Sequence, residues 1–426
     1  MRLLGVHVIG PGYGESIVIE LPTGEIGVID SFGTRHAVPP ILDFLKDRFP
    51  ALNRLKFVAL THPHADHCMG IAHYFDNYTV EEFWVFHSFI EHTCMGFFKA
   101  MHDKGTADAV EKALNLPTGS VWLEALRLRK AVKNQEGNLT KRFLFANGNS
   151  DLCDGLVRAS FLTPNDEGKW RYTQILADAA AKLITDGPKL NPDWDPGNLP
   201  HNQASGAILF EYGQTRVLLM ADAEDDLWRD LIREKGDSPL PMVHYIKGAH
   251  HGSVNGYNSK IYACASDKNT VVVITPFNRH KYSLPTREGA GHLRTHAKEV
   301  LCTNSAEACT SSGLPWECIA PRPTPSLPLE WAASCRANSK LLSLLEDQQS
   351  KHPYTPGVVR IPTKWLHDCQ ARPDLIQLLC AELRNKKVVG PRPHINDEFR
   401  VSATYDRNGI MQERYIGWGV GRLPGE

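Results

Sequence analysis

The strongest chemical signal in the sequence is the segment THPHADH, residues 61–67, which directly follows the apolar run 55–60. It holds three histidines and one aspartate, namely His62, His64, Asp66 and His67. Alternate residues of an extended segment point the same way, so the first two imidazoles can share one metal ion. The aspartate and the last histidine, past a turn, can face a second ion. Imidazole combined with carboxylate suits divalent cations such as Zn²⁺, Mn²⁺ or Fe²⁺.

Short apolar runs bounded by glycine and proline predict the strands that must position this segment. The predicted strands are 3–9, 16–20, 25–30, 55–60, 81–86, 206–212, 215–220, 242–247, 270–275 and 298–303, with a final hairpin near the C-terminus. Helices are predicted at 38–48, 223–235 and 256–265, with further helix-compatible stretches at 106–114, 170–185, 338–348 and 373–384. Two runs of strands, each followed by helices, predict an α/β fold with two packed sheets covered by helices.

The H-x-H-x-D-H pattern after an apolar strand resembles the signature of the metallo-β-lactamase-fold hydrolases. This resemblance implies a four-layer αββα sandwich and two further aspartates at the site. Asp30, at the end of EIGVID, would support the ligands from behind, and Asp222 in LLMADAE would bridge two metals. The family usually has Gly-Asp where this chain has Ala221 and Asp222. Asp222 could instead cap the helix that follows it.

The HHGS segment, residues 250–253, and the run 202–224 resemble one branch of the family. That branch includes the nuclease domain of DNA-uptake (competence) channel proteins. On this resemblance we expect His250 to be a metal ligand. His251 would contact substrate or support the ligands from behind, and it is a candidate proton donor to the leaving group.

Two neighbouring residues compete for one further position at the first metal. Many members of the family take a histidine from just before this strand, whereas the resembling branch often has asparagine nearby. His201 and Asn202 are the two candidates. We expect His201 to be the ligand because imidazole is the better donor.

The resemblance therefore implies two divalent cations, with Zn²⁺ the first expectation and Mn²⁺ or Fe²⁺ as alternatives. The implied ligands are His62, His64 and His201 at metal 1, and Asp66, His67 and His250 at metal 2, with Asp222 between the metals. Such a pair lowers the pKa of a shared water to about 7, and the resulting hydroxide attacks phosphorus or a carbonyl carbon. Asp66 would orient this nucleophile.

The expected substrate is a phosphodiester in DNA, RNA or a nucleotide, chiefly because the resembling branch handles DNA. Cations and a ring in and near the loop 275–285 could grip phosphates and stack on a base. The candidate contacts are Lys247, Arg279, His280, Lys281 and Tyr282. The same loop could equally be a solvated cluster of charges. The net charge is −1, so a broad basic field cannot hold a long nucleic acid.

Two other functions stay open. The same metal pair could cleave a lactone, a thioester or another carboxylic ester. Alternatively, the chain could be a metal-binding effector or interaction subunit of a bacterial defence system. We expect a catalytic domain over 1–303 with a helix-rich insertion at 88–200, followed by an extension over 304–426. The insertion or the extension could bind a partner protein.

Cysteine use and hydropathy suggest the compartment. No stretch has the apolar length of a membrane span, and the N-terminus reads as a strand rather than a signal peptide. The ten cysteines form no C-x-x-C pair. The spacing of Cys302, Cys309, Cys318 and Cys335 matches no standard zinc knuckle. Free thiols and a cytoplasmic location, without a membrane partner, are expected.

Overall fold

The fold was analysed in a computed structural model of the chain. The structure describes residues 3–33, 39–86, 121–185, 200–265, 270–279, 282–314, 316–318, 400–408, 410–416 and 421–422. These residues all belong to one of the two compact units of the chain, which comprises 1–320 with 399–426. The predicted helices at 106–114, 338–348 and 373–384 lie outside the described residues.

The first sheet has eight strands and combines an antiparallel half with a parallel half. In spatial order its strands are β18 (Met411–Ile416), β17 (Arg400–Tyr405), β1 (Leu4–Ile9), β2 (Ser16–Glu20), β3 (Ile26–Ile29), β4 (Arg54–Leu60), β5 (Thr79–Val85) and β6 (Thr140–Phe143). The pairs from β18 to β3 are antiparallel, and those from β3 to β6 are parallel. The strand before the histidine segment is therefore flanked by parallel neighbours.

The second sheet has nine strands and a parallel centre. In spatial order they are β16 (Glu317–Cys318), β19 (Gly421–Arg422), β15 (Glu299–Cys302), β12 (Val271–Ile274), β11 (Tyr245–Lys247), β10 (Thr215–Leu219), β9 (Ile208–Tyr212), β8 (Val157–Phe161) and β7 (Asn149–Leu152). Strands β10, β11, β12 and β15 run parallel to one another. A separate hairpin joins β13 (Phe277–Arg279) to β14 (Tyr282–Leu284).

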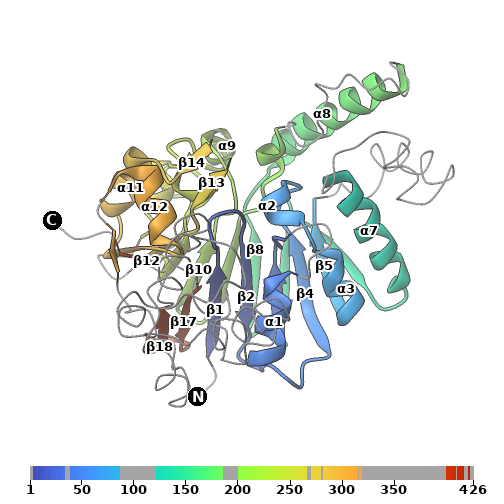
Figure 1. Cartoon of the computed structure of the whole chain (residues 1–426), viewed down its shortest axis with the longest axis horizontal. Coiled ribbons are helices and arrows are strands. Elements are labelled where there is room, and N and C mark those ends of the chain that lie inside the picture. Colours follow the sequence, from blue (N-terminus) through green and yellow to red (C-terminus); the bar gives the residue numbers. More distant parts are fainter. Residues whose placement is uncertain are drawn as a thin grey trace, which may run out of the picture. The chain divides into compact units, whose positions relative to one another are not determined.

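Helices cover the outer face of each sheet (Figure 1). The first sheet packs against α1 (Pro40–Arg48), α3 (Ala72–Asn77) and α7 (Val121–Asn134). The second packs against α9 (Asp225–Lys235), α10 (Ser259–Tyr262), α11 (Arg287–Arg294) and α12 (Ser305–Ser312). The predicted helices at 38–48, 223–235 and 256–265 correspond to α1, α9 and the shorter α10.

Alternation within the strands explains why two sheets pack face to face. In β4, Phe57 and Ala59 lie in the core between the sheets, whereas Val58 and Leu60 pack under the helices. Phe57 stacks on Trp84 of the next strand, with ring centroids 3.9 Å apart. A strand buried on both faces is apolar along most of its length. The predicted four-layer αββα sandwich is thereby confirmed.

Residues 140–161 differ from the predicted helix-rich insertion at 88–200. They form β6, β7 and β8, which extend one edge of each sheet. The sequences TKRF and NSDL are short and polar, so hydrophobic periodicity did not mark them as strands. The described helices of the segment are α7 and α8 (Asp166–Thr185).

The C-terminal part of the chain returns to the first sheet. Strand β17 pairs with β1 along its whole length, and β18 pairs with β17, so the predicted final hairpin is confirmed. Part of the 304–426 segment therefore lies in the same compact unit as the strands that precede it.

Two observations concern the cysteines and the helices of the described residues. Free thiols are present at Cys68, Cys153, Cys264, Cys302 and Cys309, as expected. None of the described helices combines the length and the apolar character needed to span a bilayer.

A buried carboxylate joins the edge strands of the two sheets. Glu82 on β5 accepts hydrogen bonds from Arg142 on β6, at 2.6 and 2.9 Å. It also accepts from Ser150 on β7 at 2.9 Å and from the Trp84 indole at 2.8 Å. Burial raises the Glu82 pKa, but the hydrogen bonds from Arg142, Trp84 and Ser150 outweigh it and lower the pKa below the ordinary value. Glu82 is therefore ionised and ties the first sheet to the second.

Glu82→Gln is expected to lower the free energy of unfolding by about 1.5–3 kcal/mol at neutral pH, because it weakens charge-assisted hydrogen bonds. The folded-state pKa lies below the unfolded one. The carboxylate therefore stabilises the fold above about pH 4.3 and ceases to do so as pH falls through the folded-state pKa. Urea unfolding across this pH range should show a flatter acid limb for the variant. Glu81→Gln, on the same strand but in a partly exposed ion pair, is the control and should cost less than about 1 kcal/mol. Equal losses in both variants would contradict this role.

The loop between β1 and β2 packs closely against the histidine segment. The Glu15 backbone N–H donates to the Asp66 carbonyl oxygen at 3.0 Å. A Cβ atom on Gly14 would lie 2.3 Å from the Phe32 Cβ and 2.9 Å from that same Asp66 oxygen. Only glycine allows this approach without displacing the segment.

Gly14→Ala should therefore destabilise the protein by about 1–3 kcal/mol, as overpacking of a tight contact does. Gly137→Ala is the control, because a Cβ there would meet no described atom within 4 Å. Urea unfolding of both variants measures the difference. A Gly14→Ala variant as stable as Gly137→Ala would show that the contact is not restrictive.

Candidate metal centre

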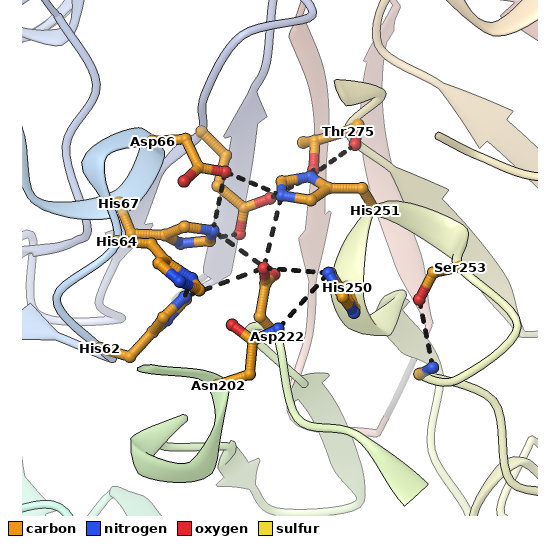
Figure 2. Close-up of polar contacts among 12 residues, drawn as sticks. His62, His64, Asp66, His67, Asn202, Asp222, His250, His251, Ser253 and Thr275 are labelled. Atoms are coloured by element: carbon orange, nitrogen blue, oxygen red, sulfur yellow. Dashed lines mark hydrogen bonds and ion pairs between the residues drawn. The ribbon is translucent and has the colours of Figure 1, made fainter. Parts of the chain in front are cut away.

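The candidate site lies where parallel strands of both sheets end. Asp30 follows β3, and the histidine segment 61–67 follows β4. From the second sheet, Asp222 follows β10, and residues 250–251 follow β11. Loops after the carboxyl ends of parallel strands share one edge of a sheet, which places these side chains together. Figure 2 shows the labelled histidines and aspartates converging on Asp222.

Backbone strain concentrates at the same loops. Asp30, Ala221, His250 and His251 have φ angles of 57°, 47°, 42° and 54°. Non-glycine residues rarely adopt this left-handed region, and such outliers cluster at functional sites. The strain is evidence, independent of ligand chemistry, that the loops hold these side chains in set positions.

The first group of ligand atoms contains His62, His64 and Asp222. The Nε2 atom of His62 lies 3.0 Å from Nδ1 of His64 and 3.8 Å from Oδ2 of Asp222. Burial, followed by the nearby His67, holds the pKa of His62 well below its ordinary value. Burial also lowers the pKa of His64. Both imidazoles are therefore neutral at pH 7, with lone pairs available to a cation.

The second group contains Asp66, His67, Asp222 and His251. Nε2 of His251 lies 3.0 Å from Oδ2 of Asp66, and Nε2 of His67 lies 3.4 Å from Oδ1 of Asp222. Burial raises the pKa of both carboxyl groups, but the two histidines outweigh it and lower the pKa of each. Asp222 contributes to both groups, because its Oδ2 lies 3.8 Å from His62 Nε2 and 3.6 Å from His251 Nε2, while its Oδ1 faces His67.

Unpartnered buried atoms test whether cations fit here. Among the described residues, His67 Nε2 and Asp222 Oδ1 are buried and have no hydrogen-bond partner. A buried polar atom without a partner costs free energy unless something else satisfies it. Imidazole nitrogen and carboxylate oxygen are the donors that Zn²⁺, Mn²⁺ and Fe²⁺ take. The residues therefore fit a pair of divalent cations.

The two histidines of the HHGS segment take different positions at the groups. His251, expected to touch substrate or to support the ligands from behind, is buried and points its Nε2 into the second group. His250, the expected ligand, lies outside both groups. Its Nδ1 is 3.1 Å from Glu224 Oε1, and its Nε2 is 3.9 Å from Asp222 Oδ2. Sequence alone could not separate them because the strained turn decides which ring faces inward.

His201 and Asn202 lie beside the groups rather than in them. His201 is buried, its Nδ1 is 2.6 Å from the Tyr172 hydroxyl, and its ring centroid is 5.0 Å from that of His64. The Asn202 amide donates to Glu224 Oε1 at 2.8 Å and lies 3.4 Å from His250 Nε2. His201 is thus next to the first group, and Asn202 faces the rim where His250 lies.

Asp30 lies behind His67 and contacts Thr61. Its Oδ2 lies 2.8 Å from His67 Nδ1, and it accepts hydrogen bonds from the Thr61 backbone and hydroxyl at 2.8 and 2.7 Å. Burial raises its pKa, while His67 and Thr61 oppose the rise. An acceptor at Nδ1 fixes the ring so that Nε2 faces the cluster.

Of the predicted substrate contacts, one is buried, one is exposed, and the others lie outside what the structure describes. Lys247 is fully buried with its Nζ 2.6 Å from Glu15 Oε2, so it is not placed to reach a substrate. Tyr282 on β14 is exposed, at 53%. The Arg279 side chain and residues 280–281 (His280 and Lys281) lie outside the described residues.

Two residues at the site were missed from the sequence. Glu15 is buried behind His67 and His251, with its carboxylate oxygens 3.8 and 3.7 Å from their Nδ1 atoms. Glu224 contacts His250 at the rim. The glycine-rich turn before Glu15 reads as a plain hairpin turn, so only its close packing reveals a role.

Comparisons with known proteins found a family model that covers part of the chain. Residues 9–86 match the family model described as the metallo-beta-lactamase superfamily. No curated protein sequence matches the chain. Solved structures with similarity include the metallo-beta-lactamase fold protein YhfI from Bacillus subtilis, at 12% identity, with 72% of this chain and 93% of that protein covered and a TM-score of 0.30.

Two further structures are similar to a comparable degree. Zn²⁺-bound PqqB from Methylobacterium extorquens has 8% identity, covers 57% of this chain and 71% of that protein, and gives a TM-score of 0.30. The archaeal metallo-beta-lactamase superfamily protein ST1585 from Sulfolobus tokodaii has 14% identity, covers 68% and 94%, and gives 0.29.

These TM-scores are low, so the assignment depends on the family model and on the observed layers. The matched residues include β2 to β5 and the whole histidine segment. The match over residues 9–86, together with two helix-covered sheets and the His/Asp groups at their shared edge, assigns the chain the fold of the metallo-β-lactamase superfamily.

Proposed function

We propose that this protein is a metal-dependent hydrolase whose substrate is a phosphodiester in a nucleotide or a short nucleic acid. The observation that carries the hydrolase proposal is the shared carboxylate. Asp222 has one oxygen 3.4 Å from His67 Nε2 and the other 3.8 Å from His62 Nε2. Two groups of ligand atoms joined in this way are the arrangement of a dinuclear site.

A pair of divalent cations bound there would supply Lewis acidity and would lower the pKa of a water between them. The chain contributes the holding geometry. Asp30 keeps the proton of His67 on Nδ1. The Thr275 carbonyl, 2.9 Å from His251 Nδ1, keeps the proton of His251 on Nδ1. Both Nε2 atoms therefore face inward. Asp66 remains ionised and anchors the second group from the first sheet.

The rim of the site favours a substrate with both an anionic and an aromatic part. Phe277 on β13 stacks against His251, with ring centroids 5.2 Å apart, and its hairpin partner strand carries the exposed Tyr282. An exposed ring can stack on a base. The resemblance of the HHGS segment and of residues 202–224 to a DNA-handling branch supports the phosphodiester class. The net charge of −1 favours a short contact.

Protein loaded with Zn²⁺ or Mn²⁺ should hydrolyse bis-p-nitrophenyl phosphate or a labelled oligonucleotide. His64→Ala and Asp66→Ala should each reduce kcat/KM by at least about 100-fold, because each removes an inward ligand atom, which is more than an outer-shell change costs. His73→Ala, on α3 and outside the two groups, is the matched histidine control. A panel of lactones, thioesters and carboxylic esters run in parallel tests the alternative. Hydrolysis of esters without any phosphodiester would overturn the substrate proposal, and full activity in Asp66→Ala would overturn the metal mechanism.

Tyr282→Ala should raise KM for a dinucleotide about 5- to 100-fold, the loss expected when one base loses a stacking partner. It should leave kcat nearly unchanged, because Tyr282 is not part of the metal groups. Tyr282→Phe keeps the ring and should retain the wild-type KM. Steady-state kinetics on a dinucleotide and on bis-p-nitrophenyl phosphate distinguish base recognition from a general defect. An unchanged KM for the dinucleotide in Tyr282→Ala would remove Tyr282 from the proposed contact.

A further inference from the structure

A fully buried ion pair lies directly behind the second group of ligand atoms. Lys247 Nζ is 2.6 Å from Glu15 Oε2, and the two side chains are 0% and 1% exposed. Lys247 is the last residue of β11 in the second sheet, whereas Glu15 lies in the loop between β1 and β2 of the first. Burying two charges costs desolvation that their attraction often fails to repay, so stability alone does not explain such a pair.

The carboxylate of this pair faces two of the inward-pointing histidines from behind. Glu15 Oε1 is 3.8 Å from His67 Nδ1, and Oε2 is 3.7 Å from His251 Nδ1. The Thr275 hydroxyl donates a short hydrogen bond to Oε2 and also lies 3.2 Å from His251 Nδ1. One carboxylate is thus close to the outer nitrogen of both rings.

This placement affects which ring nitrogen of His67 and of His251 carries the proton. For Nε2 to offer its lone pair to a cation, the ring proton must sit on Nδ1. His67 Nδ1 has Asp30 as its direct acceptor at 2.8 Å, and His251 Nδ1 has the Thr275 carbonyl at 2.9 Å. A negative charge less than 4 Å from both Nδ1 atoms favours the same tautomer in both rings. Outer partners of this kind orient metal-binding histidines.

The Lys247 ammonium group offsets negative charge at a third set of ligand atoms. Glu15, Asp30 and His67 form a third group whose ligand atoms are close enough to hold a cation. Lys247 already pairs with Glu15, which offsets the charge of one of the two carboxylates in this third group from within the protein. A divalent cation is thereby directed to the two groups that share Asp222. Without the lysine, Glu15 would be a buried unpaired carboxylate that attracts a cation to the wrong side of His67.

We propose that Glu15 and Lys247 are a positioning pair: the charge of Glu15 reinforces the Nδ1–H tautomers of His67 and His251 that Asp30 and the Thr275 carbonyl accept directly, and Lys247 keeps cations out of the third group. This inference rests on the proposed metal-dependent function, because the pair positions the two histidines of the second group. Neither residue touches substrate, and the pair acts only through the two histidines.

Three variants of the full-length protein separate positioning from stability. Glu15→Gln keeps the shape and removes the negative charge, Lys247→Met keeps the apolar stem, and the double variant has no buried charge at this place. Chelator competition followed by native mass spectrometry measures binding of the first and second Zn²⁺ ion. We expect each single variant to weaken the second ion about 10- to 100-fold and to leave the first nearly unchanged.

The double variant is the decisive one. Its thermal stability should recover toward wild type, because no charge is left unpaired, whereas the affinity for the second ion should stay low. A purely structural pair would recover both properties together. Lys260→Met, which breaks the exposed pair with Asp237 at 2.5 Å, is the control and should change neither ion. Wild-type affinity for the second ion in Glu15→Gln or in the double variant would overturn the proposal.

A second measurement does not depend on metal binding. In metal-free protein with ¹⁵N-labelled histidine at alkaline pH, the ring nitrogens of His67 and His251 should report the Nδ1–H tautomer in wild type. They should report a tautomer mixture in Glu15→Gln. Identical ring shifts in the two proteins would overturn the positioning role. Wild-type protein that shows these tautomers but binds no divalent cation would overturn the proposed function instead.

Discussion

The buried Asp222 carboxylate is the constraint on which the site depends. It belongs to the second sheet, is 2% exposed, and faces the first-sheet histidines His62 and His67 with its two oxygens. An ionised carboxylate removed from water is costly unless positive charge or donors surround it. Both sheets must therefore bring their strand ends to one edge in fixed register. The left-handed conformation of Ala221 just before it shows that the loop is bent to place this carboxylate.

Much of this architecture could be predicted from patterns that the two-sheet core imposes on sequence. Strands such as β4, buried on both faces, read as apolar runs, and the histidine segment follows such a run. Strand β7 could not be recognised, because Asn149 to Leu152 is a short, polar edge strand with little hydrophobic alternation, although its partner β8 follows after a short turn. The different placements of His250 and His251 were equally unpredictable. They follow from two consecutive positive φ angles, which hydrophobic patterns do not reveal.

Contacts between the two sheets also explain why the role predicted for Lys247 from sequence differs from its position in the structure. A lysine next to a histidine pair suggests an anion-binding group at a site. At the end of a central strand, however, its stem runs through the core, and its ammonium reaches a carboxylate from the opposite sheet. Glu15 carries no sequence signal of its own, since its position depends on how tightly Gly14 lets the loop approach Asp66. Residues that act through other residues are visible only when both sheets are assembled.

The charges at the site determine what can bind there. Three buried carboxylates, those of Glu15, Asp30 and Asp222, and the partly buried one of Asp66 outnumber the cationic groups among the described residues of the centre. These cationic groups are the Lys247 ammonium and His67, whose pKa the nearby carboxylates raise well above its ordinary value. The protein groups alone therefore give the centre a negative field, and an anionic substrate would be repelled. Two divalent cations would reverse the sign of that field, whereas the nearly neutral remainder of the chain adds little attraction. Binding of an anionic substrate, such as the proposed phosphodiester, would thus be coupled by electrostatics to metal binding, and its affinity would fall with the loss of either cation.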